Sequence, residues 1–159
     1  MKKLAVLALL LPLAACGFHP MYGTTLAPQM SSIFVEQIAE RDGYELRTAL
    51  IDLLNSDGQE GGKKYRLKIT LGESSQGIAL QNDATITRYN NTLSAKYELT
   101  DAGGTMLKQG TQSELASYNV VNSPYASLVA QQDADKRAAQ DMAERIRLDL
   151  GVWFRQQKK

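Results

Sequence analysis

The sequence predicts an α+β domain of the two-layer sandwich type, with two helices packed on one face of a mixed four-stranded sheet in the order β-α-β-β-β-α. Stretches in which apolar and polar residues alternate dominate the middle of the chain, as expected for strands with one buried face. Helical spacing of apolar residues occurs once before these stretches and once after them. Glycine-rich turns separate the segments.

The first fifteen residues are predicted to be a signal peptide. Lys2 and Lys3 precede an apolar run from Leu4 to Leu13, after which small residues approach a cleavage point. This run covers about ten residues, whereas a membrane-spanning helix needs about 20. We therefore expect residues 1–15 to be removed rather than retained as a transmembrane helix.

The sequence Leu13-Ala14-Ala15-Cys16 looks like a bacterial lipobox, in which the cysteine receives a diacylglycerol and, after cleavage, an N-acyl group. Cys16 is the only cysteine, so no intrachain disulfide competes for its thiol. Several acyl chains would anchor the protein stably in a membrane. Because Gly17 replaces the Asp that commonly retains such proteins in the inner membrane, we expect the periplasmic side of the outer membrane. The alternative is an ordinary signal peptide with an incidental cysteine.

The composition argues against nucleic acid as a partner and against an enzyme. Loss of Lys2 and Lys3 changes the formal net charge from +1 to −1, whereas phosphate backbones require a concentrated basic surface. The lone histidine, His19, offers neither a catalytic triad nor a metal cluster, and lipidated Cys16 offers no thiol. We expect no catalytic residue, no metal ligand and no cofactor besides the covalent lipid. A Ser–Lys or two-carboxylate site remains possible, although no known motif supports one.

The first part of the mature chain divides into a linker and the start of a single domain. Residues 16–32 lack periodicity and are interpreted as the lipidated N-terminus and linker, and residues 33–159 as one domain. Residues 33–38 are predicted to form the first strand. Residues 40–43 break it, and residues 44–55 form a helix with one apolar face.

Three antiparallel strands and a long helix complete the prediction. Alternation indicates strands at residues 65–71, 84–99 and 105–120. Ser123 and Pro124 suit the start of a helix. The apolar stripe of this helix comprises Ala130, Ala134, Ala138, Met142, Ile146 and Leu150, and Asp133, Asp135, Lys136 and Arg137 are among the residues assigned to its solvated faces. Val152-Trp153-Phe154 is interpreted as closing the core, with a partner contact as the alternative.

The residues Cys16-Gly17-Phe18-His19-Pro20-Met21-Tyr22-Gly23 resemble the mature start of the LPS-assembly lipoprotein LptE family, whose members begin Cys-Gly-Phe-x-Pro-x-Tyr-Gly or a close variant. Asn122-Ser123-Pro124, opening the last helix, continues this resemblance. It implies a plug and assembly partner of the outer-membrane β-barrel LptD that contacts lipopolysaccharide during delivery to the outer leaflet. The alternatives are a structural or adaptor lipoprotein with another envelope partner and, less favoured, a lipid-anchored hydrolase.

The resemblance also implies a lipopolysaccharide-binding residue, Arg88, because family members place a basic residue at this strand-to-loop junction. A guanidinium can bind a lipid A phosphate bidentately, and Tyr89 offers apolar contact. Lys96 and Lys136 are additional candidates. The sequence departs from the family pattern because Ser123 to Asp135 contains no basic residue, which weakens the case for a two-cation phosphate clamp. The alternative for Arg88 is an ordinary exposed arginine.

Overall fold

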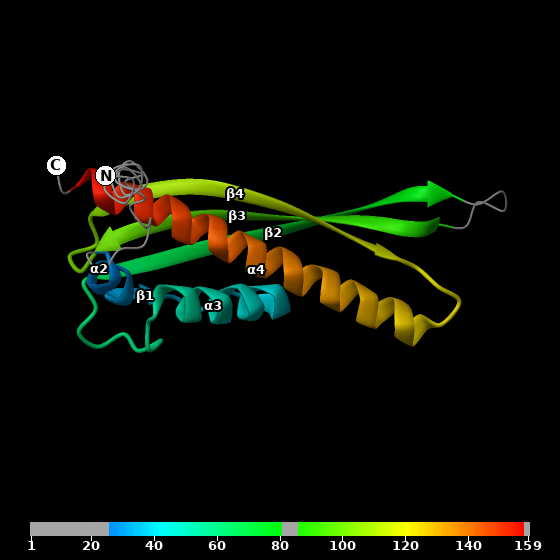
Figure 1. Cartoon of the computed structure of the whole chain (residues 1–159), viewed down its shortest axis with the longest axis horizontal. Coiled ribbons are helices and arrows are strands. Elements are labelled where there is room, and N and C mark those ends of the chain that lie inside the picture. The colour runs from blue at the N-terminus through cyan, green and yellow to red at the C-terminus, as the bar shows by residue number, and fades with distance from the viewer. Residues whose placement is uncertain (1–25, 81–85, 158–159) are drawn as a thin grey trace, which may run out of the picture.

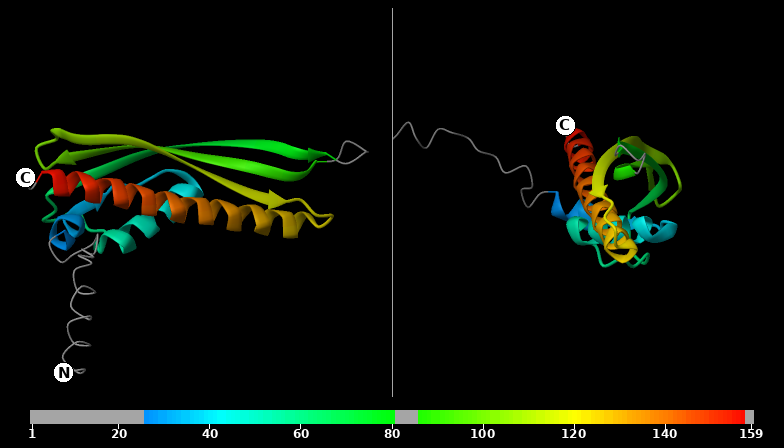
Figure 2. Two further views of the ribbon diagram at one scale, coloured as in Figure 1. Left: turned by 45° about the horizontal axis from the view of Figure 1, so that its top comes forward. Right: turned by 90° about the vertical axis from the view of Figure 1, so that its right-hand side faces the viewer.

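The computed structural model describes residues 26–80 and 86–157, and it has the predicted α+β architecture. Its elements are α2 (Ala27–Ser31), β1 (Ile33–Val35), α3 (Glu40–Leu54), β2 (Tyr65–Leu80), β3 (Ile86–Asp101), β4 (Met106–Asn119) and α4 (Pro124–Gln156). The sheet has the order β1-β2-β3-β4, with β1 parallel to β2 and the other pairs antiparallel. The sheet forms one layer, and α3 and α4 form the other (Figures 1 and 2). The expected signal peptide, Cys16 and the octet that it begins lie outside the described residues.

The core lies between the sheet and the two long helices, as the apolar patterns predict. Odd-numbered residues of β2 and β3 face the helices, because successive side chains of a strand point to opposite faces. Leucines spaced along α3 and larger apolar residues of α4 meet them. The fully buried side chains of this interface include Leu46, Leu50, Leu54, Leu67, Tyr97, Leu99, Met142, Ile146 and Leu150.

Small residues of α4 are buried where this helix packs on the sheet and on α3. Ala134, Ala138, Ala139 and Ala143 are buried, and Ala130 is partly buried, so the predicted small-residue stripe is confirmed and is wider than expected. Short side chains allow a helix backbone to lie close to a sheet. The 33-residue helix can therefore run across the strands along much of the molecule (Figure 1).

One residue assigned to the solvated face of α4 was placed wrongly. Asp135 is only 8% exposed and lies on the sheet side of the helix. The step of about 100° between successive helical residues places it next to the inward-facing Ala134. There Asn91 of β3 donates a hydrogen bond from its Nδ2 to the Asp135 carboxylate, at 2.8 Å. A polar partner on the sheet therefore permits this burial.

The end of α4 closes the core as predicted. Phe154 is buried and packs edge-on against Tyr65, with 5.1 Å between the ring centroids. Trp153 is half-buried against the same cluster. Val152, in contrast, points outward and is 47% exposed. Two of the three residues thus belong to the core.

The N-terminal elements begin and end at residues other than those predicted. β1 ends at Val35 rather than residue 38, and α3 begins at Glu40 rather than residue 44. Gly43, interpreted as part of a break, lies inside α3, where an added Cβ would be 2.7 Å from the Ile38 side chain. In addition, α2 forms within the segment assigned to the linker, and Leu26 and Met30 are buried in the core.

Strand β2 is much longer than predicted, whereas β3 has the predicted length. β2 extends to Leu80 rather than to residue 71, and the β2–β3 hairpin continues past the N-terminal end of α3 (Figure 1). Residues 72–78 of β2 are exposed. Without helical cover this segment needs no apolar alternation, so the pattern that reveals a half-buried strand stops at residue 71 although the backbone pairing continues.

The buried Tyr97 joins the sheet to the helical layer. The Tyr97 hydroxyl donates to the Asp149 carboxylate of α4, and Lys108 of β4 approaches the same carboxylate at 2.8 Å. Gly110 lies opposite Tyr97 in β4. A Cβ at Gly110 would overlap the tyrosine hydroxyl and ring.

Gly110→Ala should therefore lower the free energy of unfolding by about 1–3 kcal/mol, because the Tyr97 ring must shift and weaken its bond to Asp149. Urea unfolding followed by circular dichroism measures this loss. Gly72→Ala is the matched control, since a Cβ at this strand glycine meets no atom within 4 Å. Equal stability of the two variants would contradict the steric role of Gly110.

Candidate functional site

Polar and aromatic side chains lie on both faces of the sheet beyond the N-terminal end of α3. Tyr89 of β3 and Tyr118 of β4 lie opposite each other in the antiparallel register. Their rings stack with 5.6 Å between centroids and 14° between planes. The neighbouring Ser117 donates a hydrogen bond to the Asn90 side-chain oxygen at 2.6 Å. This half of the molecule therefore holds its strands together partly by polar and aromatic side chains.

The four predicted lipopolysaccharide-binding residues do not form one cluster. Arg88 and Lys96 are exposed, and their even numbers place both on the sheet face that points away from the helices. They are eight residue steps apart along β3, which corresponds to about 27 Å. Tyr89 follows Arg88 and therefore faces the opposite side. Lys136 is on α4, where its Nζ lies 4.0 Å from the Glu45 carboxylate of α3.

A two-cation clamp on a single phosphate therefore does not form from these residues in this structure. Arg88 remains a candidate for binding a phosphate, because its side chain is exposed to solvent. Its neighbour across the sheet is Asn119 of β4. Lys96 borders a shallow depression on the same sheet face, whose lining also includes Glu98, Gln109 and Thr111. The two positions offer separate polar surfaces on the outer face of the sheet.

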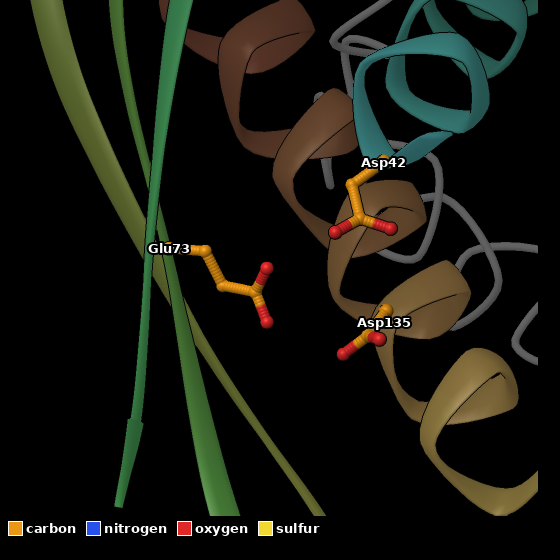
Figure 3. Close-up of side chains that lie close together, drawn as sticks. All are labelled: Asp42, Glu73 and Asp135. Carbon is orange, nitrogen blue, oxygen red and sulfur yellow. The ribbon is translucent and has the colours of Figure 1, made fainter. Parts of the chain in front are cut away.

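Three carboxylates meet between the layers, at the point where α3 begins (Figure 3). Asp42 comes from the first turn of α3, Glu73 from β2 and Asp135 from α4. One carboxylate oxygen of each lies within 4.8 Å of the others. Burial raises the pKa of Asp42, and the nearby Asp135 carboxylate raises it further. The pKa of Glu73 is raised by burial first and then by Asp135 and Asp42.

Comparison with known proteins then identifies the family. The model of the family described as "LptE: Lipopolysaccharide-assembly" matches residues 30–150. The chain belongs to this family. The resemblance found in the sequence is thus confirmed, and it extends over the two-layer sandwich from the end of α2 to the last part of α4.

Solved structures of lipoproteins share this fold. A putative lipoprotein from Caulobacter crescentus is 31% identical, with a TM-score of 0.69 over 84% of this chain and 98% of that one. Rare lipoprotein B from Shewanella oneidensis is 10% identical, with a TM-score of 0.61 over 80% and 98%. A minor lipoprotein from Acinetobacter baumannii is 16% identical, with a TM-score of 0.59 over 77% and 94%. A comparison with curated proteins finds no significant match.

Membership of the LptE family assigns the chain to lipopolysaccharide assembly. In the part of the chain that the structure describes, no helix combines the length and apolar character needed to cross a membrane. Among these residues, α4 is the longest helix, and charged residues occur along it, including Asp135, Lys136 and Arg137.

The acidic cluster was missed by sequence reasoning. Asp42, Glu73 and Asp135 are far apart along the chain, and no motif spacing connects them. Taken singly, none of them stands out: Asp42 lies in the first turn of a helix, Glu73 on a strand and Asp135 within a long helix. The one available signal was Asp135, which lies between Ala134 and the inward-facing Ala138 of the small-residue stripe.

In a buffer with a chelator at pH 7, Glu73→Gln should raise the melting temperature, because it removes one of three adjacent negative charges. The pKa of Glu73 is raised in the folded protein, so the native state binds its proton more tightly than the unfolded state. The contribution of Glu73 to the free energy of unfolding therefore becomes more favourable as the pH falls from neutrality towards the ordinary carboxyl pKa. The difference in melting temperature between the variant and the wild type should shrink over the same pH range.

The matched control for this measurement is Glu98→Gln, which changes an exposed glutamate on the outer face of β3. It should leave the pH dependence of the melting temperature close to that of the wild type. A Glu73→Gln variant that melts below the wild type at pH 7 would contradict electrostatic repulsion within the cluster.

Proposed function

We propose that this chain is a lipid-anchored subunit of the outer membrane that acts as plug and assembly partner of an LptD-type β-barrel and contacts lipopolysaccharide during its delivery to the outer leaflet. The match of the lipopolysaccharide-assembly family model over residues 30–150 carries this proposal. The anchor is the lipidated Cys16 predicted from its lipobox. The role is one of binding and assembly rather than catalysis.

The two faces of the sheet support a place inside a hydrated barrel. One face is covered by the helices and supplies the apolar core. The other carries exposed polar side chains, among them Lys68, Lys96 and Glu98. Such a surface is compatible with the polar, water-filled interior that large outer-membrane barrels have.

Association with the barrel can be tested by purification of the protein from detergent-solubilised membranes through a C-terminal tag. A large outer-membrane β-barrel protein should copurify in a fixed ratio. Depletion of the chain should reduce the amount of lipopolysaccharide at the cell surface. Recovery of the chain alone, together with normal surface lipopolysaccharide after depletion, would contradict the proposal, and a different envelope partner would favour an adaptor lipoprotein.

Arg88→Glu should weaken binding of the purified protein to lipopolysaccharide by about tenfold or more, because a charge-assisted contact to phosphate becomes a repulsive one. Binding titrations in detergent measure this change, and copurification of the barrel should persist. Lys64→Glu is the control, since it makes the same charge change at an exposed position just before β2. Equal affinities of the two variants would show that Arg88 is an ordinary surface arginine.

A further inference from the structure

A buried amide side chain lies beside the acidic cluster. Asn91 of β3 is 3% exposed, and its Nδ2 donates to the Asp135 carboxylate at 2.8 Å. The other polar atom of this amide, Oδ1, is buried and accepts no hydrogen bond from the residues that the structure describes. A buried oxygen without a donor costs free energy. A cation at the cluster would supply the missing interaction.

The carboxylates of the cluster also lack a direct cationic partner. None of the ion pairs found among residues 26–80 and 86–157 involves Asp42, Glu73 or Asp135. Arg41 lowers the pKa of Asp42, but burial and Asp135 outweigh it. The N-terminus of α3 offers Asp42 only a partial positive charge. Within the described residues, the negative charge between the layers is thus largely uncompensated.

We propose that Asp42, Glu73 and Asp135, together with Oδ1 of Asn91, form a calcium-binding site that joins the helices to the sheet. Carboxylate and amide oxygens are the ligands that calcium prefers. Water completes its coordination on the side where Glu73 is exposed to solvent. The site is distinct from Arg88 and from the outer sheet face.

Coordination chemistry favours calcium over magnesium at this cluster. The three carboxylate oxygens lie within 4.8 Å of one another, so small side-chain movements can bring them to the distances of about 2.3–2.6 Å at which calcium binds oxygen. Calcium accepts irregular coordination geometry, whereas magnesium demands near-ideal octahedral geometry at about 2.0–2.1 Å. Ligands that come from four different elements meet the requirement of calcium more readily.

The position of the site gives the ion a structural role. Its ligands come from α3, β2, β3 and α4. One ion would therefore connect the first turn of α3 to both strands of the hairpin and to the long helix. The cluster lies at the N-terminal end of α3, beyond which the β2–β3 hairpin continues without cover from this helix (Figures 1 and 3). A bound ion would fix the direction in which this hairpin leaves the two-layer part.

The test uses the purified full-length protein in detergent, from which bound metal ions are first removed with a chelator. Calcium is then titrated, and its effect is measured by thermal unfolding and by isothermal calorimetry. Calcium should raise the melting temperature in a saturable manner, with a dissociation constant of about 0.1–1 mM or below. Magnesium at equal concentration should produce a clearly smaller shift. No shift up to about 10 mM calcium, or an equal response to magnesium, would overturn the assignment.

Variants connect the response to these residues. Glu73→Gln and Asp42→Asn should each abolish the calcium-dependent shift while retaining the far-ultraviolet circular dichroism of the folded protein. Glu98→Gln should retain the full shift. A wild-type response in either cluster variant would overturn the proposal. Because the experiment uses the protein without its barrel or lipopolysaccharide, its outcome is independent of the proposed function.

Discussion

The close approach of α4 to the sheet is the constraint on which the rest of the structure depends. Ala134, Ala138, Ala139 and Ala143 are buried and present little side-chain volume, so the helix backbone can lie close to β4 and to α3, on which it packs. At this separation the hydroxyl of Tyr97 reaches a carboxylate of α4. Larger residues in the stripe would push the layers apart and remove this contact along with the packing of the leucines around it.

The same proximity produces the polar arrangement between the layers. Where the stripe begins, Asp135 is brought against the sheet and hydrogen bonds with Asn91. The first turn of α3 then places a second carboxylate nearby, and β2 a third. A packing requirement satisfied by alanines thus also brings like charges together. The protein tolerates this in a region whose nearby strand residues are partly open to water.

Sequence patterns predicted the elements in which burial of one face produces a periodic spacing of apolar residues. They missed the elements that have no such spacing. Alternation in β3 and helical spacing in α4 identified most of the core. The distal half of β2 carries exposed residues on both faces, so its strand is stabilised by backbone pairing with β3 and has no apolar signature. The start of α3 was missed because Gly43 was interpreted as a break, although close packing against Ile38 requires a residue without a side chain there.

In the candidate site, too, the features that depend on one strand were predictable, whereas those that depend on contacts between elements were not. Arg88 was predicted to lie at a strand junction, and it is exposed close to the start of β3. Its separation from Lys96 follows from strand geometry, but the place of Lys136 across the helical layer depends on how α4 crosses the sheet. The convergence of Asp42, Glu73 and Asp135 depends on that crossing too. Sequence spacing alone carries no information about contacts between elements this far apart.

The short helix α2 has a consequence for how far the domain can move from the membrane. Because Leu26 and Met30 are buried, the folded domain includes residues from 26 onwards, whereas the sequence predicts that it begins at residue 33. About ten residues then separate a lipid on Cys16 from the folded body, and even fully extended they reach only about 35 Å. The α2 end of the molecule would thus stay next to the bilayer, leaving the β2–β3 hairpin at the opposite end of the long body as the part able to explore the farthest depth (Figure 1).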